Sequence, residues 1–306
     1  MVSDIPKLKK HVLTLHPKVE QWITDMNLGG IYPRRYSDST KRIYLFNSRY
    51  FLKYLKEDLS NLIESFIKAV QETDLDENSK RKHIYESFIS YVKSLAHHKI
   101  IDKSILEEIK PYKPRRTKEP KRTTIKWIHI EKLLKEIDKQ KYSLSRKILY
   151  KSLILVLFFT GLRARELVNL KISDINLETN EIQVFNGKGG KHRKLGINKI
   201  LKPILEEYMS FRKKLEVTTD KAFLHTNYGP YTVDGIGKLV KRLHKLIDLS
   251  DCSPHSYRRG TAYYAAIERN VPLAHVQVAL NHKSICTTMN YIQVDREKVL
   301  EEMKNW

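Results

Sequence analysis

Cysteine is scarce in this chain of 306 residues, which contains only two. Two cysteines do not make a disulfide framework, so we expect free thiols in a reducing cytosol. Long apolar runs are also missing. The first residues, MVSDIPKLKKHV, do not resemble a signal peptide. The most apolar stretch, residues 153–159, is far shorter than the ~20 residues that cross a bilayer. We therefore predict a cytoplasmic protein in which this stretch is a buried helix.

Acidic residues are outnumbered as well, with 35 Asp and Glu against 57 Lys and Arg and a net charge of +22. Such an excess repels itself in a compact protein, which favours a polyanionic partner. Nucleic acid is the first candidate and an anionic membrane the second. Solubility is a third explanation, although it does not require this much charge of one sign. Since 41% of the residues are hydrophobic, a packed core is expected, and the length suits two domains.

A basic segment divides the chain into two halves. Residues 110–126, KPYKPRRTKEPKRTTIK, hold three prolines and eight Lys or Arg. The prolines prevent a continuous helix, and the charge keeps the segment in water or on phosphate. We predict domains at 1–112 and 124–306 with a basic linker at 113–123, which is either a plain solvated linker or a strap lying on a DNA backbone.

The first half is expected to be all-helical. Helices are predicted near 39–55, with Ser39 as its N-cap, and near 61–70 and 79–97. Apolar spacings of three and four define the predicted core faces of the first and third helices, which are Ile43, Phe46, Tyr50, Phe51, Tyr54 and Leu55 in one and Ile84, Phe88, Tyr91, Val92 and Leu95 in the other.

The second half is expected to be mixed. Helices are predicted near 130–137, 148–159, 199–215 and 233–247, with Gly161 ending the second. Residues 181–185 and 192–197 alternate as strands around an Asn-Gly turn, which predicts a β-hairpin. Ser253 and Pro254 resemble an N-cap and a first-turn proline, so His255 and Arg258 fall on one face of the helix that follows. The predicted fold class is mainly α with a small β-hairpin or sheet.

Four motifs follow one another in the second half: TGLRAREL at 160–167, GKGGK at 187–191, HSYR at 255–258, and LNH at 280–282 with Tyr291 nine residues beyond His282. Together they resemble the tyrosine recombinase family, which includes phage integrases and the Xer and Cre recombinases. The resemblance covers most of residues 124–295. GKGGK is not a nucleotide-binding P-loop, because the G-x-x-x-x-G-K-[ST] pattern is absent.

The resemblance implies a two-domain clamp around double-stranded DNA, with a helical core-binding domain and a mixed catalytic domain. It implies strand cleavage and rejoining through a 3′-phosphotyrosine, in DNA integration or excision or in chromosome resolution, without metal or other cofactor. It further implies a homo-tetramer on paired sites in the prokaryotic nucleoid, with accessory proteins possible. The tail, with Val294, Val299, Leu300, Met303 and Trp306, would dock on a neighbouring protomer or on its own domain.

The same resemblance gives each site residue a role. Arg163 and Arg258 would grip the phosphate oxygens, because guanidiniums bind them bidentately and stay charged. Tyr291 would be the nucleophile, and His255 would accept its proton. The remaining assignments are Lys188 as proton donor to the leaving oxygen, His282 as the residue that orients the phosphate, and Glu166 as an orienting partner of Arg163. The basic residues expected to bind DNA are Lys41, Arg42, Arg49, Arg115, Arg116, Lys121 and Arg122.

Other interpretations compete with this one. Cys252 with His255, and His282 with Cys286, have spacings that a zinc site could use, although zinc would consume both histidines. A type IB topoisomerase and a catalytically inactive DNA-binding protein are two further alternatives. A metal-dependent nuclease would need clustered carboxylates, and none is evident. Two positions depart from the recombinase pattern, since Arg259-Gly260 stands where His-Thr is common and Asn281 where Gly is common.

Overall fold

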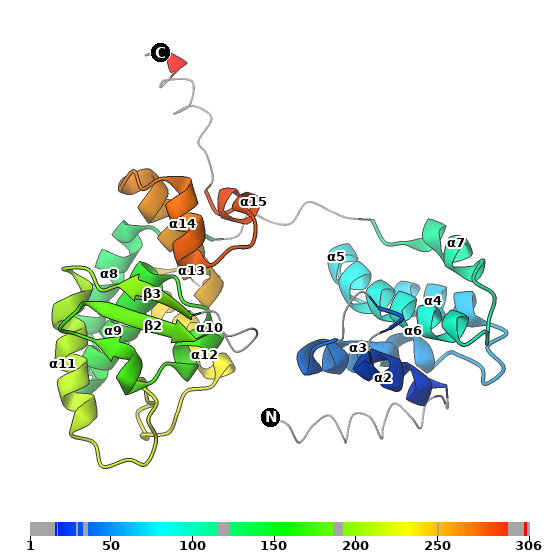
Figure 1. Ribbon diagram of the computed structural model, residues 1–306, viewed down its shortest axis with the longest axis horizontal. Coiled ribbons are helices and arrows are strands. Elements are labelled where there is room, and N and C mark those ends of the chain that lie inside the picture. The colour runs from blue at the N-terminus through cyan, green and yellow to red at the C-terminus, as the bar shows by residue number, and fades with distance from the viewer. Residues whose placement is uncertain are drawn as a thin grey trace. The chain divides into compact units, whose positions relative to one another are not determined.

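The computed structural model describes residues 16, 18–28, 30–32, 36–115, 123–185, 192–249, 251–292, 303 and 304. The chain divides into two compact units, Met1–Pro120 and Lys121–Trp306, whose elements are labelled in Figure 1. Both are mainly helical, which confirms the predicted fold class. Among the described residues, none of the helices is both long and apolar enough to span a bilayer.

The first unit is built of short helices around an aromatic core. They are α2 (Val19–Leu28), α3 (Asp38–Leu52), α4 (Leu62–Gln71), α5 (Glu77–Ser79), the π-helix η1 (Lys80–Tyr85), α6 (Glu86–His97), α7 (Ile105–Ile109) and the 3-10 helix η2 (Lys110–Tyr112). Trp22 of α2 meets Tyr91 of α6, and Phe51 of α3 meets Phe88 of α6. All five residues predicted as the core face of 79–97 are buried.

The prediction for α3 was wrong in two respects. The helix begins at Asp38, and its N-cap is Ser37, whose hydroxyl accepts a hydrogen bond from the Thr40 amide. Ile43 and Phe46 are 49% and 43% exposed. The apolar spacing marks two faces of this helix, and packing against α4 and α6 buries the face with Leu45, Phe51 and Leu52.

The second unit surrounds one central helix, α9 (Leu144–Thr160), which is buried along most of its length. It packs against α8 (Trp127–Lys139), α11 (Leu201–Lys213) and α13 (Pro254–Tyr263). The remaining helices are α10 (Ala164–Asn169), η3 (Ile172–Asp174), α12 (Val233–His244), η4 (Lys245–Ile247), η5 (Tyr264–Glu268), α14 (Leu273–Leu280) and α15 (Ile285–Met289). The predicted central helix is therefore confirmed.

The second unit also contains a small antiparallel sheet, with strand order β1-β2-β3. β2 (Glu181–Phe185) and β3 (His192–Gly196) form the predicted hairpin, and Val184 pairs with Arg193. The predicted turn at 186–191 lies outside the described residues. β1 (Ile175–Asn176) was not predicted, because two residues are too few to show an alternating pattern.

Candidate active site

Gly161 sets the start of the site at the end of α9. It has φ +60 and caps the helix in the left-handed conformation, which a residue without Cβ adopts without strain. A Cβ here would lie 2.5 Å from Leu280 Cδ2. The turn brings Arg163 to the N-cap of α10, two residues later. The Glu166 carboxylate accepts a hydrogen bond from the Arg163 amide and another from its Nη1, both at 2.9 Å.

The helix α13 supplies the second arginine. Ser253 is its N-cap and Pro254 occupies its first turn, as predicted. His255 is exposed, whereas Arg258 is buried with 1% exposure. Arg258 Nε donates to His282 Nε2 at 3.2 Å, Nη1 donates to the Gly161 carbonyl at 2.7 Å, and Nη2 donates to the Leu280 carbonyl. Three of the five guanidinium N–H groups are thus used, which leaves one on each Nη for an anion.

Arg258 keeps its charge in this environment. Burial and the nearby charge of Arg163 lower the pKa of Arg258 to about 10, which is still well above neutral pH. The charge therefore remains available for a phosphate, and the three protein acceptors fix its direction.

His282 is held as a neutral imidazole of one tautomer. Since Arg258 Nε always carries its hydrogen, His282 Nε2 must be the acceptor, and the ring proton sits on Nδ1. That Nδ1 lies 2.8 Å from the buried hydroxyl of Thr288 on α15. Burial, with the positive charges of Arg258, Arg163 and Arg193, lowers the pKa of His282 to about 4. The imidazole is thus uncharged at neutral pH and supports the guanidinium of Arg258.

Tyr291 follows α15 and lies beside His282. The two rings meet edge to face, with centroids 5.0 Å apart and an interplanar angle of 80°. The Tyr291 amide donates to the Thr288 carbonyl at 3.0 Å, so the helix that holds His282 also holds the tyrosine. Tyr291 is partly buried against the small cluster of Ala262, Val276 and Leu280.

The other tyrosines near the site are placed differently. Tyr257 is fully buried, and its hydroxyl lies 3.2 Å from His244 Nε2. Tyr264 packs in an aromatic group with Trp127 and Phe158. Tyr263 lies under the ammonium of Lys126, 5.3 Å from its ring centre. Of these four tyrosines, Tyr291 is the one in ring contact with His282.

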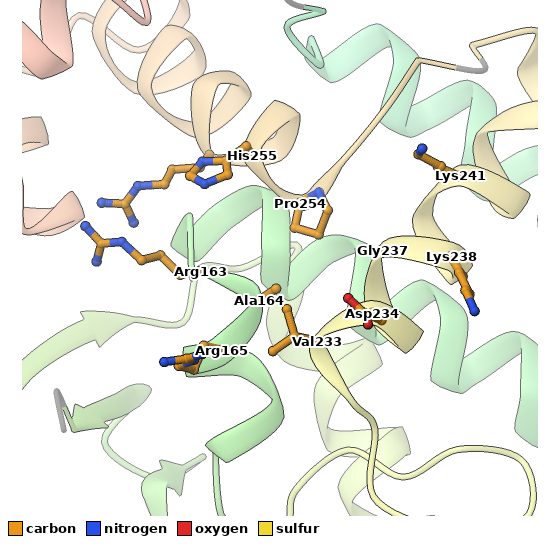
Figure 2. Close-up of a pocket in the computed structure, with 11 residues that line it drawn as sticks. Arg163, Ala164, Arg165, Val233, Asp234, Gly237, Lys238, Lys241, Pro254 and His255 are labelled. Carbon is orange, nitrogen blue, oxygen red and sulfur yellow. The ribbon is translucent and has the colours of Figure 1, made fainter. Parts of the chain in front are cut away.

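A groove of about 500 Å³ opens beside Arg163 and Arg258. Figure 2 shows Arg163 and Arg165 on one side of it and Lys238 and Lys241 of α12 on the other. His255 and Arg258 complete the basic lining, against which Asp234 is the acidic member. The groove therefore suits a polyanion.

Sequence reasoning missed Arg193 of β3. Its Nη1 and Nη2 bind the two carboxylate oxygens of Glu166 at 3.2 and 2.8 Å. Burial alone raises the pKa of the Glu166 carboxyl, but hydrogen bonds from Arg193 and Arg163 outweigh it and lower the pKa to about 2. A signal was present, because Arg193 shares the inward face of its strand with the buried Leu195. An arginine is unusual at such a position.

No group of three or more metal-ligating side chains stands together in the described parts of the chain. The zinc alternative also conflicts with the chemistry of its members. Both ring nitrogens of His282 are engaged by protein groups. Burial raises the pKa of the Cys252 thiol to about 11, whereas zinc binds the thiolate.

Several predicted site residues lie elsewhere or outside the described residues. Lys188, Arg116, Lys121 and Arg122 fall in undescribed segments, as does most of the predicted tail. Of the first unit's basic residues, Lys41 is bound to Asp38 and Asn27. Arg49 lies over the ring of Phe46, Arg42 lines a hollow on α3, and Arg115 is exposed.

The unusual pair Arg259-Gly260 has a local explanation. Arg259 Nε and Nη2 both donate to the Thr123 carbonyl, at 3.2 and 2.6 Å. A Cβ on Gly260 would lie 2.1 Å from the Ile125 carbonyl oxygen. The pair therefore lets the start of the second unit cross α13 in close contact, next to the helix turn that carries His255 and Arg258.

The chain is similar to known proteins in sequence and in fold. The model of the phage integrase family matches residues 125–298. A tyrosine recombinase of Thermosipho africanus is 28% identical over 275 residues, which are 87% of this chain and 92% of that protein. Tyrosine recombinase XerA of Pyrococcus horikoshii is 32% identical over 154 residues, half of this chain and 53% of the relative. The crystal structure of the recombinase XerH on its palindromic difH substrate matches with a TM-score of 0.68 at 22% identity, over 88% of this chain and 80% of that one.

Proposed function

From the premise that this chain belongs to the phage integrase family and is a tyrosine recombinase, we propose that Tyr291 is its nucleophile. The hydroxyl of Tyr291 attacks a DNA phosphodiester and forms a bond to phosphorus, and the bond from phosphorus to the 5′ oxygen breaks. The products are a 3′-phosphotyrosine and a free 5′ hydroxyl. Attack by a 5′ hydroxyl of the partner strand reverses these steps and releases the tyrosine. Because each step exchanges one phosphodiester for another, neither ATP nor a metal is required.

One observation carries this proposal: Tyr291, His282 and Arg258 form a contiguous chain, and Arg258 at its end lines a basic groove. The spare N–H groups of Arg258 and the guanidinium of Arg163 bind the non-bridging oxygens of the phosphate. Charge that develops on those oxygens is stabilised by donors already fixed in place. His282 contributes by holding Arg258, because its Nε2 is an acceptor in this arrangement.

The two proton transfers are assigned to His255 and Lys188. His255 lines the groove and is exposed, and it accepts the proton that Tyr291 loses. A neutral imidazole nitrogen can accept a proton, which suits this role. Lys188 gives a proton to the departing 5′ oxygen. This role rests on the match of Lys188 to the family's hairpin lysine.

Duplex DNA is the proposed partner, as it is for the XerH structure with difH. Residues 1–112 serve as the core-binding domain, 113–123 as a strap on the backbone, and 124–306 as the catalytic domain. Lys41, Arg42, Arg49, Arg115, Arg116, Lys121 and Arg122 bind phosphates together with the groove lysines. Four protomers assemble on two DNA sites in the prokaryotic nucleoid.

A nicked duplex tests the proposal. Duplexes that bind the protein are selected from a random-sequence pool, and a nick is placed so that the short cleaved strand diffuses away. In EDTA, the wild type is expected to form a covalent adduct on a denaturing gel, and Tyr291→Phe is expected to bind the same DNA without an adduct. An adduct with Tyr291→Phe rejects the nucleophile assignment.

A further inference from the structure

We propose that Arg193 is a positioning residue for DNA cleavage, which acts through Glu166 to keep the charge of Arg163 available to the phosphate. The proposal deepens the function proposed above and rests on it. Arg163 and Arg193 bind the carboxylate of Glu166 directly, and the charge of Arg258 interacts with the same carboxylate. These four residues are called the Glu166 cluster.

The contact between Arg193 and Glu166 is buried and bidentate. Their side chains are 11% and 8% exposed, and the two nitrogens lie 3.2 and 2.8 Å from the carboxylate oxygens. With the two bonds from Arg163, the carboxylate accepts four N–H groups. Each oxygen therefore has one bond from each arginine.

A buried ion pair of this kind is weak evidence for a role in stability. Removing charges from water costs several kcal/mol per ion, and apolar residues of similar volume often serve equally well. In addition, the Nε of Arg193 is buried and has no hydrogen-bond partner among the described residues. The guanidinium at this inward-facing strand position therefore carries a desolvation cost, and a role for its charge in the site gives a reason for that cost.

The reason why the charge of Arg193 matters is the net charge of the Glu166 cluster. Without Arg193, the negative charge of Glu166 would cancel the positive charge of Arg163 at 2.9 Å, and one net positive charge would remain with Arg258. With Arg193 present, three guanidiniums and one carboxylate leave two net positive charges. The field of Arg193 reaches the rest of the site, since it contributes to the lowered pKa values of Arg258 and His282.

Two positive charges match the transition state. A phosphodiester carries one negative charge, and attack by a phenolate oxygen brings a second. Preorganised charges aimed at such an intermediate supply much of the catalysis in enzymes. Arg193 thus offsets the carboxylate that orients Arg163, so that orientation is obtained without loss of charge.

Single-turnover cleavage of the nicked duplex, with DNA binding measured in parallel, tests this role. Arg193→Gln is expected to cleave about 10- to 100-fold more slowly than the wild type. This rate loss is at or below the loss that follows removal of a hydrogen-bond donor that contacts the oxyanion directly. Its DNA affinity should change less than about threefold, because one charge in a large interface is removed. Arg193→Lys keeps the charge and should cleave within about tenfold of the wild type. Lys194→Gln is the matched control, since the neighbouring Lys194 is 63% exposed and pairs with Glu181.

The double variant Glu166→Gln/Arg193→Gln separates charge from geometry. It lacks the buried ion pair but restores two net positive charges on Arg163 and Arg258. We expect it to cleave at least about tenfold faster than Arg193→Gln, the size of effect that one coupled charge pair produces. A double variant that is folded and no faster than Arg193→Gln overturns the proposal. So does an Arg193→Gln protein that cleaves within threefold of the wild type.

A neutral substrate gives a second readout that a purely structural role would not change. A methylphosphonate at the cleavage position removes one negative charge from the transition state, so the defect of Arg193→Gln should shrink at least about threefold. An undiminished defect contradicts the proposal. If Arg193→Gln does not fold, Arg193→Lys and the double variant decide, because the proposal requires both to cleave within about tenfold of the wild type. Tyr291→Phe is run alongside, since an adduct there rejects the proposed function itself.

Discussion

Arg258 Nε donates a hydrogen bond to His282 Nε2 across 3.2 Å, and this bond joins the two residues on which the phosphate site depends. It fixes the imidazole tautomer, with its other nitrogen 2.8 Å from the Thr288 hydroxyl. The guanidinium is thereby held between α13 and the turn that follows α14, and Tyr291 makes an edge-to-face contact with the same imidazole ring. His282 therefore acts as the hydrogen-bond acceptor that orients the guanidinium of Arg258.

Replacing His282 tests that role. In His282→Gln, the amide oxygen can take the place of Nε2 and accept from Arg258, so cleavage should fall about tenfold or less. In His282→Leu, the buried Nε of Arg258 loses its acceptor, and cleavage should fall about 100-fold or more. Single-turnover rates on the nicked duplex measure both. Equal rates for the two variants would show that the acceptor is not what matters.

The depressed pKa of His282 predicts how stability depends on pH. The folded protein holds His282 neutral down to about pH 4, whereas an unfolded histidine titrates near 6.5. Between these values the unfolded state binds the extra proton. The contribution of His282 is therefore fully present above pH 6.5 and is lost as the pH falls towards 4.

Urea unfolding at several pH values from 4 to 7 measures this contribution. The difference in unfolding free energy between the wild type and His282→Gln should be larger at pH 7 than at pH 4. The glutamine variant is the control, since it cannot titrate in this range and shares every other group. A difference that stays constant with pH would contradict the assignment of a neutral, buried imidazole.

Gly260 and Gly237 form a matched pair for a test of packing. A Cβ at Gly260 would lie 2.1 Å from the Ile125 carbonyl oxygen, whereas one at Gly237 would meet nothing within 4 Å. Gly260→Ala should therefore lower the unfolding free energy by about 3 kcal/mol, at the upper end of overpacking costs. Gly237→Ala, inside α12, should be neutral or stabilising by up to about 1 kcal/mol. Denaturant melts measure both, and an unaffected Gly260→Ala protein would show that the crossing of α13 is not tight.

The groove lysines make a prediction about salt. If the protein contacts about 10 phosphates, the logarithm of its affinity should fall with the logarithm of salt concentration with a slope near −9. Lys238→Gln and Lys241→Gln should each reduce that slope by about one. Lys139→Gln is the control, because Lys139 pairs with Glu136 on α8. A nearly flat slope for the wild type would remove the electrostatic basis of the proposed DNA interface.

Local patterns predicted much of this fold. The all-round apolar α9 with Gly161 at its end, the hairpin of β2 and β3, and the Ser253-Pro254 start of α13 each depend on a few consecutive residues. The core face of α3 was predicted wrongly at Ile43 and Phe46, because the apolar residues of this helix cover two faces. Tertiary packing against α4 and α6 selects between them, and that choice is invisible to spacing.

The site residues that lie in short motifs of consecutive residues could be predicted from the sequence. The order of Arg163, His255, Arg258, His282 and Tyr291 is evident in the sequence, and the structure brings Arg258, His282 and Tyr291 into contact. The bond from Arg193 to Glu166 joins residues 27 positions apart on a strand and a helix. Such a contact depends on how the hairpin packs on α10. The one signal of it in the sequence is that Arg193 occupies an inward-facing position of its strand.

The central claim is that Tyr291 forms the covalent bond to DNA. Its most direct test is to trap the wild-type protein on the nicked duplex in EDTA, digest both components, and locate the remaining nucleotide by mass spectrometry. The account predicts a 3′-phosphonucleotide on the peptide that contains Tyr291. A nucleotide attached to Tyr257, Tyr263, Tyr264 or any other residue, or an adduct through a 5′ phosphate, would contradict it.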